Sequence, residues 1–404
     1  MRIWIVNQYA IPPSVPGGTR HFQFARRLIE RGHEVLLVAQ SVQHFTTSEI
    51  ADTGSQLYLR QEVEGVPFLW VKTPPYQGNG LGRIRNMLQF GRRVRRGAAS
   101  WGIARPDVIL GSTPAPTAAL AARRLARRWG IPFALEIRDL WPQTFLDIGT
   151  FRTWHPAMVV LARLERSLYQ AADHIFTLLP ASFEHIRARG GGDKITWLPN
   201  GVALDTLPDI GPPEEGGSFR LIYAGAHNLA NSLDTFLLAA SSLVRRGEAG
   251  KVELHFYGEG HAKADLLRQR DAAGLDFVHF HPAVPKTDIY QVLATADAFL
   301  IAEHDSPLYR HGTSRNKMFD YLAMKRPVIS ATSSVSDPVM ESGGGISVPA
   351  ERPEAVADAI LELVGLTAET RQKMGALGRC WVEEVHDFEL LTDRLESRLQ
   401  AMVE

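Results

Sequence analysis

The residues best suited to chemistry lie between positions 306 and 330, where a glycine-containing loop leads into a predicted helix. Arg315 and Lys317 fall in the first turn of that helix, and Asp320 follows on the same helical side. Cations beside a helix N-terminus stabilise phosphate groups, and a carboxylate one turn later can accept hydrogen bonds from sugar hydroxyls. The segment is therefore typical of a nucleotide site, and a solvated ion pair on an amphipathic helix explains the same pattern equally well.

Two further segments place polar or flexible residues after apolar strands. Gly17 and Gly18 precede a predicted helix, and a glycine pair lets backbone N–H groups approach an anion closely. Arg138 and Asp139 directly follow the apolar run 133–137. Glycine pairs are also common in loops, and charged pairs often form surface salt bridges. Both interpretations stay open from these residues alone.

Short apolar runs alternate with helical stretches along the whole chain, which predicts βαβ units and parallel sheets covered by helices. The expected strands are 3–6, 35–38, 68–71, 107–111, 133–137, 175–178, 220–223, 252–257, 277–280, 298–301, 327–330 and 346–348. Ligands bind beyond the carboxyl ends of the strands in such sheets, which is where the polar segments above fall.

The domain organisation is predicted from a stretch rich in proline, glycine and charge at 207–218, which we interpret as a linker. We expect one doubly wound α/β domain over residues 1–206 and a second over 219–386. The last residues, 387–404, have apolar side chains at helical spacing. We expect them to form a helix that packs back across the domains.

The formal net charge is zero, but the charge is unevenly distributed. Residues 1–200 contain 25 Lys and Arg against 14 Asp and Glu, so the remainder carries an equal acidic excess. Residues 82–97 hold no acid and six arginines, which are Arg83, Arg85, Arg92, Arg93, Arg95 and Arg96. Interleaved apolar residues predict a basic amphipathic helix that can lie on anionic lipid. A solvated helix whose arginine stems cover apolar surface is the structural alternative.

Composition excludes several classes of protein. A single cysteine among 404 residues rules out a disulfide framework. The sequence contains no run of about 18 apolar residues, so we expect no segment to span a membrane. The 14 histidines lack metal-ligand spacing and no Asp-x-Asp occurs, so we expect no metal and no cofactor. No nucleic-acid recognition motif accompanies the basic half, so we expect no nucleic-acid partner.

Motifs spread over the chain resemble those of the family 4 retaining glycosyltransferases of the GT-B fold. Within that family, they resemble bacterial O-antigen and capsule enzymes of the fucosamine-transferase type. The matching segments are 17–20, 136–142, 199–202, 223–225, 257–260, 312–321 and 327–329. The resemblance implies two Rossmann-like domains facing a central cleft, the first for the acceptor and the second for a nucleotide-sugar donor.

The same resemblance implies roles for individual residues. Arg315 and Lys317 would neutralise the leaving diphosphate, and Arg138 and Asp139 would face the transferred sugar or the acceptor hydroxyl. The implied donor contacts are Gly17, Gly18, Gly225, Val284, Pro285, Gly312, Ser314, Asn316 and Asp320, with 284–285 at the base and Asp320 at the ribose. Arg20, Trp141 and the six arginines would lie on the acceptor and membrane side. The family's usual first glutamate is replaced here by Gly312.

The expected activity is metal-independent transfer of a hexosyl or N-acetylamino sugar in cell-surface polysaccharide assembly. The donor would be UDP-linked and the acceptor lipid-linked or a glycan. We expect a cytoplasmic protein that is peripheral on the inner face of the plasma membrane. Two alternatives stay open: a UDP-sugar 2-epimerase on the same fold, and a non-catalytic partner of a glycan-assembly complex.

Overall fold

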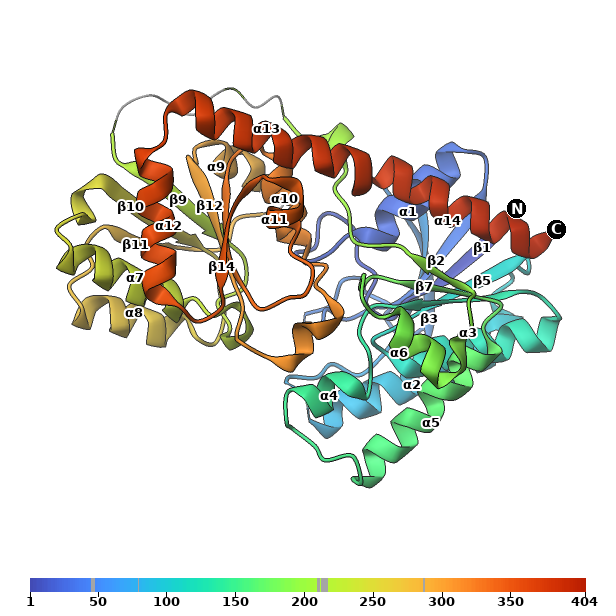
Figure 1. The fold of residues 1–404 in the computed structure, drawn as a ribbon. Coiled ribbons are helices and arrows are strands. Elements are labelled where there is room, and N and C mark those ends of the chain that lie inside the picture. Colours follow the sequence, from blue (N-terminus) through green and yellow to red (C-terminus); the bar gives the residue numbers. More distant parts are fainter. Residues whose placement is uncertain (45–47, 79, 209–210, 212–216, 286–287) are drawn as a thin grey trace. The chain divides into compact units, whose positions relative to one another are not determined.

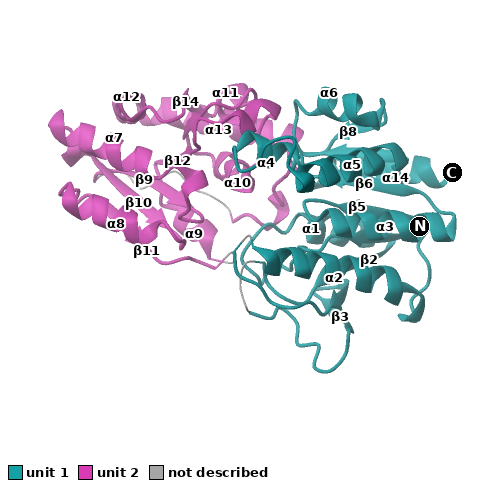
Figure 2. Ribbon diagram, turned by 90° about the horizontal axis from the view of Figure 1, so that it is seen from below, with its two compact units in different colours: residues 1–199, 388–404 teal, residues 200–387 magenta. Residues whose placement is uncertain are grey.

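The computed structural model describes residues 1–404 except 45–47, 79, 209–210, 212–216 and 286–287. The chain forms two compact units, one of residues 1–199 and 388–404 and the other of residues 200–387 (Figures 1 and 2). Each unit is a sheet of mainly parallel strands with helices packed against it. The predicted fold class, two doubly wound α/β domains, is confirmed.

The first unit contains an eight-stranded sheet in the order β3-β4-β2-β1-β5-β6-β7-β8. Its strands are β1 (Arg2–Val6), β2 (Glu34–Gln40), β3 (Tyr58–Val63), β4 (Val66–Val71), β5 (Val108–Ser112), β6 (Phe133–Ile137), β7 (His174–Thr177) and β8 (Ile195–Trp197). Its helices are α1 (Arg20–Glu30), α2 (Leu81–Gly97), α3 (Pro116–Trp129), α4 (Gln143–Asp147), α5 (Pro156–Ala171), α6 (Phe183–Ile186) and α14 (Phe388–Val403). Only β3 runs antiparallel to its neighbour, β4.

The second unit contains a six-stranded, all-parallel sheet in the order β11-β10-β9-β12-β13-β14. Its strands are β9 (Phe219–Ala224), β10 (Val252–Tyr257), β11 (Val278–His281), β12 (Ala298–Ala302), β13 (Val328–Thr332) and β14 (Gly345–Pro349). Its helices are α7 (Asp234–Arg245), α8 (Lys263–Ala272), α9 (Ile289–Ala294), α10 (Asn316–Ala323), α11 (Pro338–Ser342), α12 (Pro353–Gly365) and α13 (Ala368–Val385). No described helix has both the length and the apolar character that a membrane crossing requires.

Local sequence explains why these elements form. The central strands β5 and β12 are buried along their whole length, as expected where helices cover both faces of a parallel sheet. Helix α3 begins at Pro116, whose missing N–H costs nothing in a first turn, and ends before Gly130 in a left-handed conformation. The strand order reverses at β1 in the first unit and at β9 in the second, and ligands bind at such reversals.

The boundary between the units lies at residues 199–200, upstream of the linker expected at 207–218. Asn200 donates a backbone hydrogen bond to Ser314, and Val202 pairs with Asp387, so both belong to the second unit. The last helix, α14, packs within the first unit, where Phe388 contacts Phe24. Much of the expected linker (209–210 and 212–216) lies outside the described residues.

Candidate functional site

In the second unit, glycines bring the loop after β9 close to the start of α10. A side-chain carbon added at Gly225 would lie 2.6 Å from the Lys317 Nζ, so the lysine reaches this loop only because the side chain is absent. One added at Gly258, which follows β10, would overlap the Gly225 carbonyl oxygen. Backbone from two strand ends therefore meets a lysine side chain from the first turn of a helix. Proteins commonly bind anions with this combination.

The Lys317 ammonium has no carboxylate partner among the described residues. Its Nζ donates to the Tyr223 hydroxyl at 2.7 Å and to Asn231 Oδ1 at 3.2 Å, and lies 4.3 Å from the centre of the Tyr223 ring. Burial, reinforced by the nearby Arg315, holds the pKa of Lys317 well below its usual value. Enclosing a charge without a counter-ion is unfavourable, and a bound anion would relieve that penalty.

Arg315 differs from Lys317 because its charge is already matched. Its guanidinium pairs with Glu303 at 3.0 Å and donates to the Ala302 carbonyl oxygen and the Tyr309 hydroxyl. Glu303 is 2% exposed, and burial raises the pKa of its carboxyl despite the opposing effect of Arg315. The predicted role of Arg315 in neutralising a diphosphate must therefore compete with this internal pair. Lys317 is the better placed of the two.

Asp320, one turn further along α10, lies beside α9. The Tyr290 hydroxyl of α9 donates to Asp320 Oδ1 at 3.0 Å, and burial together with Asp320 raises the pKa of Tyr290. Helix α9 begins just after Val284 and Pro285, and the Pro285 carbonyl oxygen accepts a backbone hydrogen bond from Ile289. The structure thus links the carboxylate expected at a ribose to the loop expected at a base.

The remaining residues of the 312–316 loop shape the backbone. Gly312 has a φ of +86°, a conformation that favours glycine over the glutamate usual at this position. The Ser314 hydroxyl accepts a hydrogen bond from the Asn200 backbone N–H at 2.9 Å, and its carbonyl oxygen accepts one from the Asn200 side chain. Ser314 therefore holds the first residue of the unit, a role that the sequence does not reveal. Asn316 is the first residue of α10.

His227 is a residue of this region to which the sequence assigned no role. Its ring is 0% exposed and contacts the Phe280 ring, with 5.7 Å between ring centres. Neither ring nitrogen has a hydrogen-bond partner within the described parts of the chain. Burial, more than any neighbouring charge, lowers the pKa of His227 to about 4, so the ring is neutral at physiological pH. The sequence signal that could have identified His227 is its position two residues after Gly225, in the loop that follows β9.

In the first unit, a buried ion cluster joins β6, α1 and residues 198–199, which precede the boundary between the units. Glu136 is 0% exposed and accepts hydrogen bonds from Arg20 at 2.8 Å and His21 at 2.6 Å. Arg20 also donates to the carbonyl oxygens of Leu198 and Pro199. Burial opposes ionisation, but His21 and Arg20 hold the pKa of Glu136 well below its usual range. Arg20 is 2% exposed, so it positions these segments and does not present its charge to an acceptor or membrane.

Arg138, Asp139 and Trp141 lie beyond the carboxyl end of β6, as the sequence predicts. The Arg138 backbone N–H donates to Thr113 Oγ1 at 2.8 Å, and its guanidinium forms no ion pair with any residue that the structure describes. Arg83, from the first turn of α2, lies over the Trp141 ring at 5.2 Å. The start of the basic helix and the loop after β6 therefore meet at one edge of the first unit.

Three further residues of this edge are not signalled by the sequence. His44, which follows β2, hydrogen-bonds the Tyr76 hydroxyl and packs against the Tyr9 ring, with 4.3 Å between ring centres. Burial, together with Arg83 and Arg138, lowers the pKa of His44 to about 4. The edge thus combines cationic and aromatic side chains with a neutral imidazole.

Gly17 and Gly18 lie between β1 and α1, at the strand-order reversal of the first unit. Gly17 has a φ of +141°, and an added side-chain carbon would lie 2.6 Å from Ile11 Cδ1. The first turn of α1 contains no acidic residue, so the positive end of its dipole is not offset there. The loop has the backbone expected of an anion contact.

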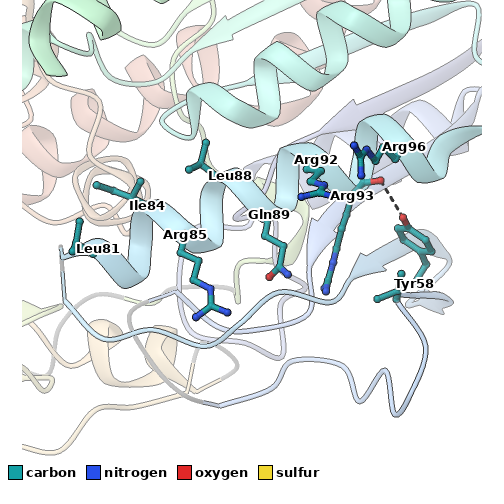
Figure 3. Close-up of a pocket in the computed structure, with 10 residues that line it drawn as sticks. Tyr58, Leu81, Ile84, Arg85, Leu88, Gln89, Arg92, Arg93 and Arg96 are labelled. Carbon is teal, nitrogen blue, oxygen red and sulfur yellow. Dashed lines mark hydrogen bonds between the residues drawn. The ribbon is translucent and has the colours of Figure 1, made fainter. Parts of the chain in front are cut away.

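The predicted basic helix is α2 (Figure 3). Met87, Phe90 and Val94 pack into the core, and four of the six arginines are exposed. The exposed four are Arg85, Arg92, Arg95 and Arg96. Arg83 and Arg93 are half-buried; Arg93 donates to the Lys72 carbonyl oxygen. The helix is therefore amphipathic, with a charged face turned outward.

The outward face of α2 is not purely polar. Leu81, Ile84 and Leu88 are 83%, 48% and 59% exposed. With Leu57 and Tyr58 they line an open groove of about 730 Å³ that arginines border (Figure 3). Exposed apolar side chains ringed by cations are unusual on a surface that meets only water.

Two family models match separate parts of the chain. Residues 17–201 match the family described as "Glycosyl transferase 4-like domain", and residues 218–365 match the one described as "Glycosyl transferases group 1". No curated protein sequence matches the chain significantly.

Solved structures share the fold over nearly the whole chain. Sucrose-phosphate synthase from Thermosynechococcus elongatus is 13% identical with a TM-score of 0.75, over 99% of this chain and 98% of that one. Anabaena HepE in complex with UDP-glucose is 14% identical with a TM-score of 0.70, over 99% and 100%. An α,α-trehalose-phosphate synthase (UDP-forming) from Burkholderia vietnamiensis is 12% identical with a TM-score of 0.72, over 99% and 98%. At these identities the likeness establishes the fold.

Proposed function

Because the chain is a glycosyltransferase of the GT-B fold, we propose that it transfers a hexosyl or N-acetylamino sugar from UDP to an acceptor hydroxyl with retention. The observation that carries the proposal is Lys317, a partly buried cation without a carboxylate partner among the described residues, beside Gly225 and the start of α10. This arrangement is suited to a diphosphate.

The transfer chemistry requires the charge that develops on the leaving group to be stabilised. When the bond between sugar and UDP breaks, negative charge builds on the diphosphate oxygens. Lys317 would donate to these oxygens, assisted by the backbone near Gly225 and by the amino end of α10. We propose that no metal ion takes part in this step, since the sequence has no Asp-x-Asp and a fixed cation is available.

We infer the identity of the nucleotide from the part of the site that lies around Asp320 and the loop before α9. Asp320 would accept hydrogen bonds from ribose hydroxyls, and the backbone at Val284 and Pro285 would contact the base. The choice of UDP is supported by two similar structures, HepE in complex with UDP-glucose and a UDP-forming trehalose-phosphate synthase. These neighbours do not fix the sugar that this enzyme transfers.

The acceptor would bind at the edge of the first unit that holds Arg138, Asp139 and Trp141. We propose a lipid-linked or glycan acceptor in cell-surface polysaccharide assembly, in keeping with the resemblance to O-antigen and capsule enzymes. An acceptor carried by a lipid diphosphate would be anionic, and Arg138 makes no ion pair with a described residue. Helix α2 would then place the enzyme on the inner face of the plasma membrane.

The decisive experiment measures UDP release from a panel of UDP-sugars, with and without a bacterial lipid extract as acceptor. The proposal expects release that depends on the acceptor and persists in EDTA. Conversion of UDP-N-acetylglucosamine without an acceptor would instead identify an epimerase. Absence of turnover with every donor, together with unaltered cellular glycan in a Lys317→Ala strain, would favour a non-catalytic partner. Loss of activity in EDTA and its return with Mn²⁺ would overturn metal independence.

Membrane association is tested separately by sedimentation with vesicles of phosphatidylglycerol or phosphatidylcholine. Replacing Arg85, Arg92 and Arg96 by glutamine should abolish binding to the anionic vesicles. The matched control replaces Arg124, Arg127 and Arg128, three exposed arginines of α3, and should bind normally. Equal loss in both triple variants would show an effect of net charge and would refute a specific role of α2.

A further inference from the structure

Three metal-ligating side chains gather on one face of the second unit's sheet, apart from Lys317 and Asp320. His255 of β10 lies in register with His279 of β11, and Glu253 precedes His255 by two residues on the same face. Ligand atoms of the three residues all lie within 4.8 Å of one another. The strand register creates this cluster, which is why no sequence spacing announces it.

We propose that Glu253, His255 and His279 bind one divalent transition-metal ion of the zinc type. Glu253 Oε2 and His255 Nε2 are 3.3 Å apart. Two ligands that each lie about 2.0 Å from a tetrahedral zinc ion are themselves about 3.3 Å apart. The two atoms form a hydrogen bond when His255 Nε2 is protonated, and their separation also equals the one that zinc requires. His279, whose ligand atom lies within 4.8 Å of both, would complete three protein ligands by a side-chain adjustment.

His281 supplies the outer contact that ligating histidines usually have. Its Nε2 lies 3.0 Å from His255 Nδ1, so the His255 Nδ1–H can donate to it. That tautomer leaves a lone pair on His255 Nε2, which faces the Glu253 carboxylate, and a cation between them would satisfy both acceptors. His281 is itself held by stacking on Tyr257 at 4.2 Å and by Lys263, which donates to its carbonyl oxygen.

The chemical type of the three ligands determines which class of ion the site would bind, and their exposure to solvent determines whether an ion can reach it. Two imidazoles and one carboxylate suit zinc, cobalt or nickel, whereas magnesium and calcium prefer sites made only of oxygen ligands. Arg220 of β9 lies in register with Glu253 and carries a competing positive charge, although the two form no ion pair in the described chain. The His255 side chain is 13% exposed and the Glu253 side chain 36%, so an ion can enter from solvent.

The proposed ion would join the edge strand β11 to β10. Strand β11 ends at His281 and leads to the loop with Val284 and Pro285. We assign the ion a structural role at this edge, with no part in releasing the diphosphate. The site therefore stands or falls independently of the transferase proposal, and its tests read metal binding directly.

The experiment uses untagged full-length protein, freed of metal with chelator and dialysed. Equilibrium dialysis should show one Zn²⁺ per chain, and Co²⁺ should give the visible absorption of a site with nitrogen ligands. Zn²⁺ should also raise the melting temperature. His255→Ala and His279→Ala should each weaken Zn²⁺ binding at least tenfold. His261→Ala, which removes an exposed histidine of the same unit, should leave binding unchanged.

A near-isosteric variant guards against misfolding as the cause. Glu253→Gln keeps the side-chain volume, so the metal-free protein should melt as the wild type does while Zn²⁺ affinity falls at least tenfold. Absence of stoichiometric Zn²⁺ binding would overturn the proposal. Wild-type affinity in the Glu253→Gln and His279→Ala variants would overturn it equally, as would a preference for Ca²⁺ or Mg²⁺.

Discussion

Replacing Lys317 by methionine removes the ammonium while it keeps most of the aliphatic stem. In the unliganded protein this ammonium contacts Tyr223 and Asn231, and no carboxylate that the structure describes. Burial lowers the pKa of Lys317, so the protein already disfavours the charge. Loss of two hydrogen bonds is offset by removal of an enclosed charge. We therefore expect the free energy of unfolding to change by less than about 1 kcal/mol.

The effect on catalysis should be far larger. Loss of one preorganised donor to a developing anion costs about 2.7–4 kcal/mol, which is a fall of roughly 100- to 1000-fold in kcat. A charge-assisted hydrogen bond contributes about 1.5–3 kcal/mol, so UDP should bind roughly 10- to 150-fold more weakly. The Lys317→Met variant should thus be as stable as the wild type but nearly inactive.

The matched control is Arg315→Met, which removes the same charge two residues earlier. It leaves the Glu303 carboxylate buried without its cation, a loss that costs about 3–5 kcal/mol. Urea unfolding, single-turnover UDP release and the thermal shift produced by UDP should be measured on both variants. The reasoning is refuted if Lys317→Met unfolds as readily as Arg315→Met while it still binds UDP normally.

Four other substitutions test contacts elsewhere in the two units. Glu136→Gln should lower the free energy of unfolding by about 3–5 kcal/mol at pH 7. Because the pKa of Glu136 is depressed in the folded state, the stability that this carboxylate contributes is complete above its unfolded-state pKa and is lost as the pH falls through its folded-state pKa. The urea midpoints of the wild type and the variant should therefore converge in acid. Asp320→Asn should raise the Kd for UDP about tenfold by calorimetry, whereas Tyr290→Phe, which removes only a supporting hydrogen bond, should raise it less. Gly225→Ala should push the Lys317 Nζ out of place and weaken UDP binding without loss of secondary structure by circular dichroism; unchanged affinity would contradict the role of this close approach.

Much of the fold is predictable because buried parallel strands have a strong sequence signature. Each expected strand is present, whereas the sequence did not predict β3 and β8. Strand β3 is an edge strand with three exposed polar residues in its middle, and β8 has only three residues. Neither presents the apolar run that reveals a central strand.

The domain boundary shows a different limit of sequence reasoning. A run of prolines and glycines marks a place where regular structure stops, and 207–218 is such a place. The unit begins earlier because Asn200 makes two hydrogen bonds to Ser314, more than a hundred residues away. Long-range contacts of this kind decide where a compact unit starts, and no local composition encodes them.

Positions of candidate site residues follow from the sequence better than their partners do. Carboxyl ends of parallel strands share one edge of a sheet, so a residue after a strand is correctly placed as soon as the strand is recognised. Gly225 and Arg138 are examples. The contacts of Tyr223 with Lys317, of Tyr290 with Asp320 and of His44 with its cationic neighbours become visible only in the folded chain. The proposed metal site at His255 depends on strand register in the same way.

Arg315 and Lys317 show what this limit means for mechanism. Both are cations at the start of one helix, and by sequence they are equivalent ligands for a diphosphate. Two positions apart near a helix start, their side chains leave in different directions. Arg315 turns back to the end of β12, where buried Glu303 matches its charge. Lys317 turns to the end of β9, where its hydrogen-bond partners among the described residues are a hydroxyl and an amide. Charge available to a ligand is therefore a property of the fold around a cation, and this difference supports our proposal that Lys317 contacts the leaving group while Arg315 supports its loop.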